Sequence, residues 1–313
     1  MHEFDLITAL LADEPPLPDW VRTGPGDDAA VLCPASGSEW VLSTDTLVEG
    51  RHFPAGMPPD LLGWRALAVN LSDLAAMGAK PSGFLVALVA PALDERWCRG
   101  FSAGLRAAAG DSGARLVGGN LARGPLAVTV TVTGTVPAGT ALLRSGARPG
   151  DVLFVSGRIG AAVAALRELE AGPEVLAGLT LATVPEALRA YLLPQARIGL
   201  GLRLRGRASA CIDVSDGLLA DLGHICEASA VAAEVELEAV PIAPGVAAET
   251  ALSGGDDYEL LFTLPEATDA EPLRADDVPL QRIGRIVSGT GLRLLDAEGR
   301  DVAIGARGWS HFQ

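Results

Sequence analysis

Residues 60–78, DLLGWRALAVNLSDLAAMG, decide the fold, because they form the clearest helix in the sequence. Asp60 suits the N-cap of this helix, Gly78 suits its C-terminal end, and Pro81 follows it. Apolar residues occupy nearly every side of the helix, which is typical of a helix buried in a core.

Two polar side chains and a methionine share one face of this helix. Asn70, Asp73 and Met77 are spaced by three and four residues, so their side chains are neighbours on a helix surface. A carboxylate on a buried helix is costly unless it is paired or bound to a metal ion. Asp73 is therefore the first candidate for a functional residue, with a purely structural role as the alternative.

Strands and helices alternate around this helix. The continuous apolar run 84–90, FLVALVA, predicts a buried strand, and the alternation of Val and Thr over 128–133 predicts a half-exposed one. We expect further helices at 94–109, at 159–171 and from 215–216 toward 228, further strands at 151–156, ending at 212–214, and near 292–295, and a polar loop at 266–279.

A stretch dense in Pro and Gly, VPAGTALLRSGARPGD at 136–151, separates two such halves. We therefore expect an α/β (α+β) protein of two domains, one at 1–137 and one at 148–313. A chain of 313 residues with 49% hydrophobic residues and a mean hydropathy of +0.31 is long and apolar enough for two cores.

The composition excludes several classes of partner. The net charge of −15, from 39 acidic and 24 basic residues, disfavours binding to nucleic acid or to an anionic membrane surface. No apolar run reaches the roughly 18–20 residues of a membrane span. The acidic N-terminus is unlike a signal peptide, and four scattered cysteines fit a reducing compartment, so we expect a cytoplasmic protein.

The usual nucleotide-binding motifs are missing from the sequence. Lys80 is the only lysine, and neither GxxxxGK[ST] nor GxGxxG occurs.

Carboxylates are concentrated beside glycine in four short segments, to which Asp73 adds a fifth element. The segments are GPGDDAA (24–30), STDTLVEGRHF (43–53), DVSDG (213–217) and SGGDDYE (253–259). Converging carboxylates require a counter-charge, and an all-oxygen cluster selects a hard cation such as Mg²⁺. Taken singly, the segments are also compatible with ordinary turns, and DVSDG with a helix N-cap.

Four further features carry two interpretations each. His52 is suited to contact a phosphate, with a structural role as the alternative. Arg144 is suited to the same contact, with a position on the surface as the alternative. Gly118–Gly119–Asn120 suits a strand-to-loop approach to phosphate, or a glycine turn. Trp309 suits stacking on a flat or cationic ring, or core packing.

These motifs, read together, resemble the thiamine-monophosphate kinase family, within the aminoimidazole ribonucleotide synthetase superfamily. The resemblance runs through GPGDDAAVL, STDTLVEGRHF, NLSDLAAMGAKP, LVGGN, IDVSDGLLADL, SGGDDYELLFT and GWSHF. It implies two α/β domains, with N-terminal halves that pair into a homodimer through a barrel-like interface. It also implies use of Mg²⁺ and ATP to convert thiamine monophosphate to thiamine diphosphate.

The resemblance also implies roles for particular residues. Mg²⁺ ligands are implied at Asp28, Ser43, Thr44, Asp45, Asp73, Asp213 and Asp216. ATP contacts are implied at Gly119, Asn120, Arg144 and Ser215, and substrate contacts at His52, at the acidic turn Asp256–Asp257 and at Trp309. The family usually reads GGDT where this chain has Gly118–Gly119–Asn120–Leu121; Asn120 supplies an amide oxygen to the metal site but no charge.

The chemistry that follows is direct in-line phosphoryl transfer without a covalent intermediate. The acceptor is already an ionised phosphate, so no catalytic base is assigned. Two alternatives remain: another ATP-using enzyme of the same superfamily, and a nucleotide-binding dimer that has lost catalysis.

Overall fold

The structure is a computed structural model, and it describes residues 10–11, 16–23, 31–32, 35–274 and 278–303. Two short strands, β1 (Val21–Thr23) and β2 (Val31–Leu32), form a ribbon before the first sheet. The first sheet has four strands in the order β3-β6-β4-β5. Its strands are β3 (Ser38–Val48), β4 (Lys80–Ala90), β5 (Arg115–Arg123) and β6 (Ala127–Pro137).

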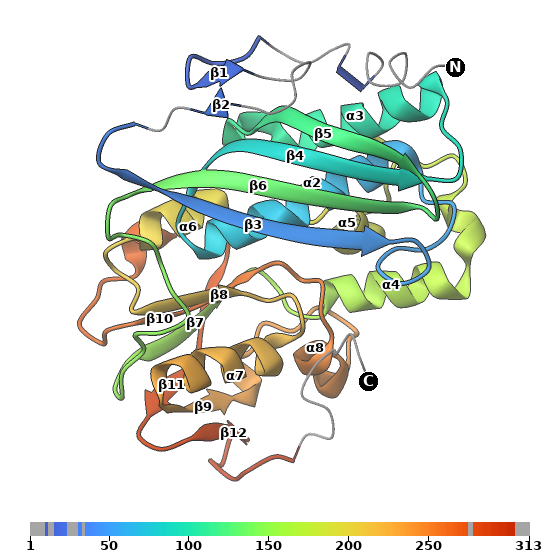
Figure 1. Cartoon of the computed structure of the whole chain (residues 1–313). Coiled ribbons are helices and arrows are strands. Elements are labelled where there is room, and N and C mark those ends of the chain that lie inside the picture. The colour runs from blue at the N-terminus through green and yellow to red at the C-terminus, as the bar shows by residue number, and fades with distance from the viewer. Residues whose placement is uncertain (1–9, 12–15, 24–30, 33–34, 275–277, 304–313) are drawn as a thin grey trace.

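Two helices, α2 (Pro59–Ala76) and α3 (Glu95–Ala109), cover one face of this sheet (Figure 1). They cross at two glycines: a Cβ on Gly63 would lie 2.1 Å from the carbonyl oxygen of Phe101, and one on Gly104 would lie 2.0 Å from that of Asp60. The absence of side chains at this crossing lets the two backbones touch. The apolar residues all round α2 are thereby buried, as the sequence predicts.

The second sheet has six strands in the order β12-β9-β11-β7-β10-β8. Its strands are β7 (Val152–Ser156), β8 (Ala210–Asp213), β9 (Ala232–Glu236), β10 (Leu260–Leu264), β11 (Leu280–Val287) and β12 (Gly291–Leu295). The helices of this half are α4 (Ala161–Ala171), α5 (Glu186–Leu192), α6 (Ile198–Leu204), α7 (Leu218–Ser229) and α8 (Ala248–Ser253).

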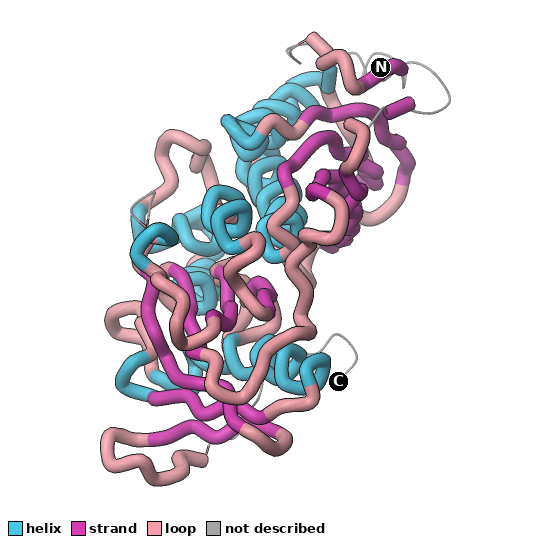
Figure 2. The backbone as a smooth tube through the Cα atoms, turned by 90° about the vertical axis from the view of Figure 1, so that its left-hand side faces the viewer, coloured by secondary structure: helices cyan, strands magenta, loops and turns pink. Residues whose placement is uncertain are grey.

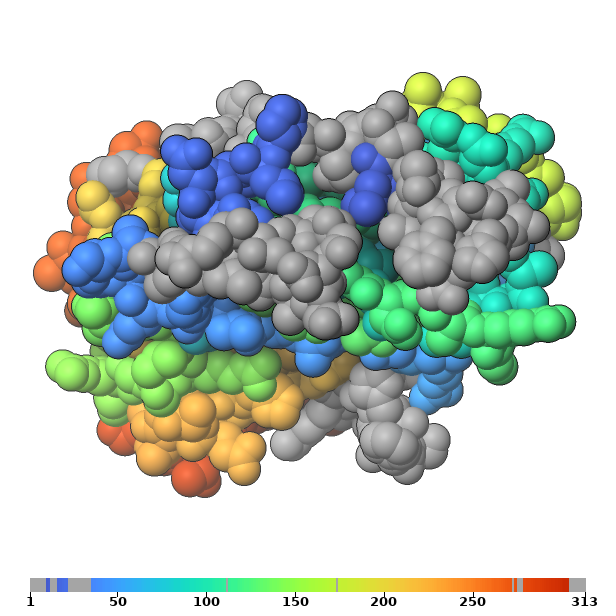
Figure 3. All heavy atoms as spheres, turned by 45° about the horizontal axis from the view of Figure 1, so that its top comes forward, coloured from blue at the N-terminus to red at the C-terminus, as the bar shows by residue number. Residues whose placement is uncertain are grey.

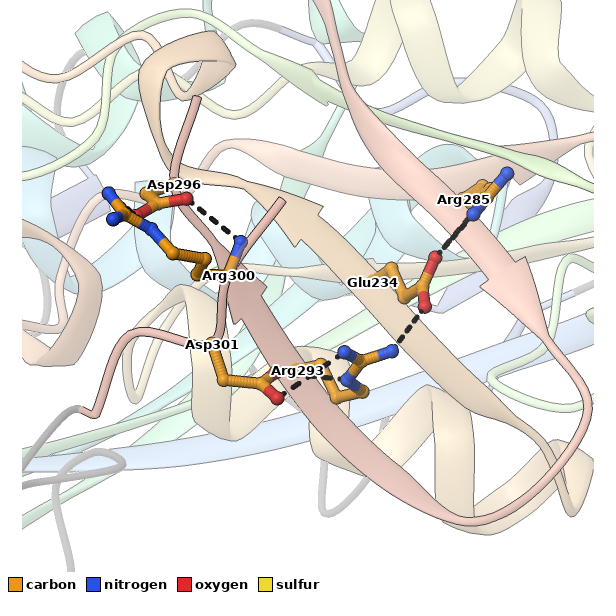
Figure 4. Close-up of polar contacts among 6 residues, drawn as sticks. All are labelled: Glu234, Arg285, Arg293, Asp296, Arg300 and Asp301. Carbon is orange, nitrogen blue, oxygen red and sulfur yellow. Dashed lines mark hydrogen bonds and ion pairs between the residues drawn. The ribbon is translucent and has the colours of Figure 1, made fainter. Parts of the chain in front are cut away.

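Ion pairs attach the parallel edge strand β12 to this sheet. Glu234 on β9 accepts from Arg285 on β11 at 2.7 Å and from Arg293 on β12 at 2.8 Å (Figure 4). Arg293 also pairs with Asp301, which follows β12. One carboxylate thus joins three neighbouring strands.

Helices between the two sheets join the halves. In the side view the sheets lie at opposite ends of the molecule with helices between them (Figure 2), and the space-filling view shows blue-to-green and orange atoms in continuous contact (Figure 3). Helix α6 packs so closely on α2 that a Cβ on Gly201 would lie 2.0 Å from the carbonyl oxygen of Ala75. Helices α4 and α5 contribute side chains to the core of the N-terminal half. The central helix α2 therefore touches both halves.

The two-domain α/β class is confirmed, and most expected elements are present with shifted ends. Three local expectations are wrong. Asp60 is not the N-cap of α2: Pro58 takes that position, because Pro59 suits the first helical turn, and Asp60 instead accepts from the Leu181 amide at 2.9 Å.

The run 84–90 lies on β4, but buried residues alternate in it with the exposed Leu85 and the half-buried Ala87 and Val89. Leu85 is 39% exposed because, within the part of the chain that the structure describes, no helix covers that face of the sheet. Gly118–Gly119–Asn120 forms neither a loop nor a turn: it lies inside β5, and a Cβ on Gly119 would meet the carbonyl oxygen of Val86 at 2.1 Å. Among the described helices, none is long and apolar enough to cross a membrane.

Candidate active site

The C-terminal part of α2 connects strands from both halves through three side chains. Asp73 accepts from the Ser43 hydroxyl on β3, with an Oγ–Oδ2 distance of 2.6 Å. Asn70 accepts from the backbone amide of Asp45, also on β3, at 3.0 Å. On the other side, the Ser72 hydroxyl donates to Asp213 at the end of β8, at 2.7 Å. These contacts gather three carboxylates, those of Asp45, Asp73 and Asp213, which we call the acidic cluster.

The carboxylates of the acidic cluster repel one another. Burial, together with the charges of Asp213 and Asp45, raises the pKa of Asp73 to about 7, although the Ser43 hydrogen bond and Arg144 oppose the shift. Burial likewise raises the pKa of Asp213 to about 6, against the Ser72 hydrogen bond, and Asp221 and Asp45 contribute to the rise. Negative charge therefore outweighs positive charge around Asp73 and Asp213, a balance that favours binding of a cation.

A magnesium ion fits this donor set. All of the candidate ligand atoms are carboxylate and hydroxyl oxygens, which hard cations prefer. The raised pKa values are those expected of ligands without their cation, because a cation would favour the ionised form. Ser43, Asp45, Asp73 and Asp213 are the residues that would hold the ion.

The turn between β8 and α7 owes its shape to a residue that follows it. Asp221, in the first turn of α7, accepts from the backbone amides of Ser215, Asp216 and Gly217 at 3.0, 3.1 and 3.2 Å. The N-cap of α7 is Gly217, within the segment 213–217, but it makes no side-chain cap bond. Burial and the charge of Asp216 raise the pKa of Asp221 to about 7, although its three backbone bonds oppose the shift. Asp216, Asp221 and His224 offer atoms within 4.8 Å of one another.

Both carboxylates of the acidic turn already have partners within the protein. Asp257 accepts from the amides of Gly160 and Ala162 at the start of α4, at 2.8 and 3.3 Å. Asp256 pairs with the buried Arg65 of α2 at 2.5 Å and accepts from the Tyr258 hydroxyl at 2.9 Å. The turn is thus tied to both halves of the molecule.

The other candidate site residues from the sequence differ in their burial and in their contacts. His52 is half-buried, and its Nδ1 accepts from the Val48 amide at 3.0 Å. Arg144 is exposed in the segment that joins the two sheets, and Ser215 is half-buried after β8. The Thr44 hydroxyl contacts that of Thr131 at 2.9 Å on the neighbouring strand β6.

Gly119 and Asn120 lie away from the acidic cluster. Asp45 on β3 pairs with Val130 on β6, which pairs with Val86 on β4, which pairs with Gly119 on β5. Three strand spacings separate Asp45 from Gly119, or about 14 Å. Asn120 is the next residue on this outer strand and is exposed. Asp28 and Trp309 lie outside the described residues.

Sequence reasoning missed three residues that shape the site: Arg65, Ser72 and Asp221. The sequence pointed to the neighbourhood of two of them, because Ser72 precedes Asp73 and Asp221 follows the segment 213–217. Arg65 gave a weaker signal, as a charged residue in an otherwise apolar helix.

The two α/β halves correspond to the two domains of the AIR synthase related proteins, and the chain belongs to that class. The family described as AIR synthase related protein, N-terminal domain, matches residues 26–136, and its C-terminal domain matches residues 148–296. A more particular match follows from whole-chain relatives. Thiamine-monophosphate kinase of Salmonella typhimurium is 42% identical over 307 residues, covering 93% of this chain and 92% of the relative. The chain belongs to the thiamine-monophosphate kinase family.

Solved structures agree with this assignment. The crystal structure of thiamine-monophosphate kinase from Stenotrophomonas maltophilia K279a has a TM-score of 0.82 and 41% identity, with 96% of each chain covered. The structure described as AaThiL complexed with AMPPCP and TMP has a TM-score of 0.76 and 31% identity, covering 99% of this chain and 96% of that one.

Proposed function

We propose that this protein transfers the γ-phosphoryl group of ATP to thiamine monophosphate, giving thiamine diphosphate and ADP. The observation that carries the proposal is the acidic cluster, in which α2 holds Asp73 against Ser43 of one half and, through Ser72, Asp213 of the other. Membership of the thiamine-monophosphate kinase family supports the choice of substrates. The relative that was solved with AMPPCP and TMP supports it further.

The reaction joins two anions, so the protein has to position them and offset their repulsion. Bound Mg²⁺ would supply positive charge between the phosphates. The serine hydroxyls orient the carboxylates, because Ser43 donates to Asp73 and Ser72 donates to Asp213. A general base is not needed, because the acceptor phosphate is ionised at neutral pH.

The sequence assignments of individual residues remain proposals. We assign metal binding to Asp28, Ser43, Thr44, Asp45, Asp73, Asn120, Asp213 and Asp216, ATP binding to Gly119, Asn120, Arg144 and Ser215, and substrate binding to His52 and Trp309. We also assign the acidic turn Asp256–Asp257 to the substrate site, where Arg65 and the Gly160 amide hold its two carboxylates in place.

We also propose a homodimer formed through the exposed face and edges of the first sheet. Leu42 on the outer strand β3 is 64% exposed and Leu85 on β4 is 39% exposed. In a barrel closed by two copies, each outer strand meets an outer strand of the partner. Asn120 lies on the outer strand β5, so the barrel would place it at the interface and would explain its distance from the acidic cluster of its own chain.

The test is an assay of the purified protein with Mg-ATP and thiamine monophosphate, with the products separated by chromatography. Equimolar thiamine diphosphate and ADP are expected. ATP binding without thiamine diphosphate would instead favour another enzyme of the superfamily or a non-catalytic nucleotide-binding dimer. The three described cysteines are free, in keeping with the cytoplasmic location that we propose.

A further inference from the structure

Arg65 is the largest side chain that is fully buried among the described residues, with 1% of its surface exposed. It lies on α2, two helical turns before Asp73. Arginine is almost never buried to this extent unless its charge is paired. The partners of its guanidinium group therefore indicate why it is there.

All of the recorded contacts of this guanidinium group are to the C-terminal half. One terminal nitrogen pairs with Asp256 at 2.5 Å, and the other donates to the backbone carbonyl of Tyr191 at 2.7 Å. The carbon at the centre of the group lies 3.9 Å from the centroid of the Tyr191 ring. The Nε atom has no hydrogen-bond partner among the described residues. A planar fork stacked on a ring can keep this arrangement, whereas an ammonium group cannot.

The first partner, Asp256, contacts Ser215, which we assign to the nucleotide side of the site. The Asp256 amide donates to the carbonyl of Ser215 at 2.8 Å, and the Tyr258 amide donates to that of Val214 at the same distance. Asp256 and Tyr258 have φ angles of +69° and +51°. Residues other than glycine keep this conformation only where their surroundings enforce it. The ion pair to Arg65 and the Tyr258–Asp256 hydrogen bond provide that enforcement.

The second partner, Tyr191, leads to the proposed acceptor side. Its hydroxyl donates to the backbone carbonyl of His52 at 2.9 Å. His52 is held in turn by a hydrogen bond from its amide to the carbonyl of Val48. One side chain on α2 thus holds both the segment that carries Ser215 and the segment that carries His52.

We propose that Arg65 is a positioning residue that fixes the nucleotide side of the site relative to the acceptor side. The group that acts together comprises Arg65, Asp256, Tyr258 and Tyr191, and we call it the arginine junction. This inference rests on the proposed function for its kinetic consequences. Each substrate binds mainly to its own side, so loss of the junction impairs the alignment of the two phosphates more than the binding of either substrate.

The first variant is Arg65→Lys, which keeps the positive charge but loses the forked contact. We expect kcat to fall about 100-fold, the loss typical of a misaligned pair of reactants, with KM for ATP and for thiamine monophosphate within about threefold of wild type. Tyr191→Phe, which removes only the hydroxyl contact to His52, is expected to lower kcat about tenfold and to lower Tm only by the small amount that one lost hydrogen bond costs. The matched control is Arg99→Lys, which alters an exposed ion pair with Glu95 on α3 and should leave kcat unchanged.

A readout independent of turnover is amide hydrogen exchange. Arg65→Lys should speed exchange of the Asp256 and Tyr258 amides at least tenfold while leaving Leu222 and Ile225 in α7 unaffected. A wild-type protein that forms no thiamine diphosphate would refute the proposed function, and the exchange result alone would then decide whether Arg65 holds the turn. If wild type is active, an unchanged kcat in Arg65→Lys with a lower Tm would mean a merely structural arginine and would overturn the proposal. Should Arg65→Lys fail to fold, a wild-type kcat in Tyr191→Phe would overturn it instead.

Discussion

Asp73 shows how one residue can serve both the fold and the site. Its helix is buried because of the apolar residues around it, and its carboxylate has a single recorded hydrogen bond, from Ser43. The charges of Asp213 and Asp45 raise the pKa of this carboxylate, and the charge of Arg144 opposes them. Carboxylates arranged in this way favour the binding of a cation, but their mutual repulsion lowers the stability of the protein when no cation is bound.

The substitution Asp73→Asn tests this role. It preserves the shape of the side chain but removes the negative charge, so kcat/KM should fall by at least about 100-fold, as when a group that stabilises transition-state charge is removed. Steady-state kinetics measures the loss. The matched control is Asp94→Asn. Asp94 is the N-cap of α3 and accepts a hydrogen bond from the Trp97 amide, and an asparagine side chain can accept the same bond. Near-normal turnover of Asp73→Asn would contradict the proposed metal site.

The role of a single residue could be predicted from the sequence only where the energetic cost of burying it was apparent within one helix or strand. Asp73 stood out because a charge inside an apolar helix demands a partner. The partners themselves were not predictable: Arg65 and Asp256 are 191 positions apart, and no local pattern links them. The use of Asp257 as a cap for α4 was hidden for the same reason, with 97 positions between Asp257 and Gly160.

At the scale of the element, the crossing of α2 and α3 places the site. The two helices approach at Gly63 and Gly104, where a Cβ atom would overlap a backbone carbonyl oxygen of the other helix. This contact sets how α2 lies on the sheet, and hence where the Asp73 carboxylate meets β3. A substitution at this crossing should therefore lower the free energy of unfolding.

Gly104→Ala should destabilise the protein by about 3 kcal/mol or more, because backbone atoms cannot yield to the added methyl group as side chains can. Urea unfolding followed by circular dichroism measures the change. Gly223→Ala in α7 is the matched control: nothing lies within 4 Å of its Cβ position, so the better helix propensity of alanine should add about 0.5–1 kcal/mol. Equal effects of the two substitutions would show that the α2–α3 crossing is looser than described.

Elements were more predictable than their arrangement. Periodicity and end signals identified α2, α3, β6 and α4, because these depend on neighbouring residues. Strand order depends on contacts far apart in the sequence, such as β9 between β11 and β12, and was not predictable. The apolar run on β4 was expected to be buried on both sides, but one of its faces has no helix over it in the described structure.

At the scale of the whole molecule, that uncovered face bears on assembly. Leu42 on β3 and Leu85 on β4 are exposed on either side of the threonine-rich strand β6, and exposed leucines of this kind are typical of a surface that meets another protein. Leu85→Glu should convert a dimer of about 64 kDa into a monomer of 32.1 kDa, because it places a charge inside the proposed interface. Size-exclusion chromatography with light scattering measures the mass. Val175→Glu, at a site of similar exposure (38%) outside this sheet, should remain dimeric; a monomeric wild type would refute the barrel.

The acidic cluster also makes stability depend jointly on pH and on Mg²⁺. Asp73 and Asp213 have pKa values of about 7 and 6 in the metal-free fold, above the ordinary value of 3.8. The folded state therefore binds protons more tightly than the unfolded state, and raising the pH from 5 to 8 removes stability from the metal-free protein. Mg²⁺ binds the ionised carboxylates and should restore that stability.

The rise in Tm on adding Mg²⁺ should consequently be larger at pH 8 than at pH 5.5, where protons compete for the same oxygens. Differential scanning calorimetry in buffers of equal ionic strength measures both values, with Ca²⁺ and Na⁺ salts as ionic controls. Asp73→Asn should be more stable than wild type at pH 8 without metal, because it removes one of the repelling charges, and should gain less from Mg²⁺. A Mg²⁺ effect of the same size at both pH values, or an equal gain from Mg²⁺ in Asp73→Asn and wild type, would show that the cation does not bind to these carboxylates.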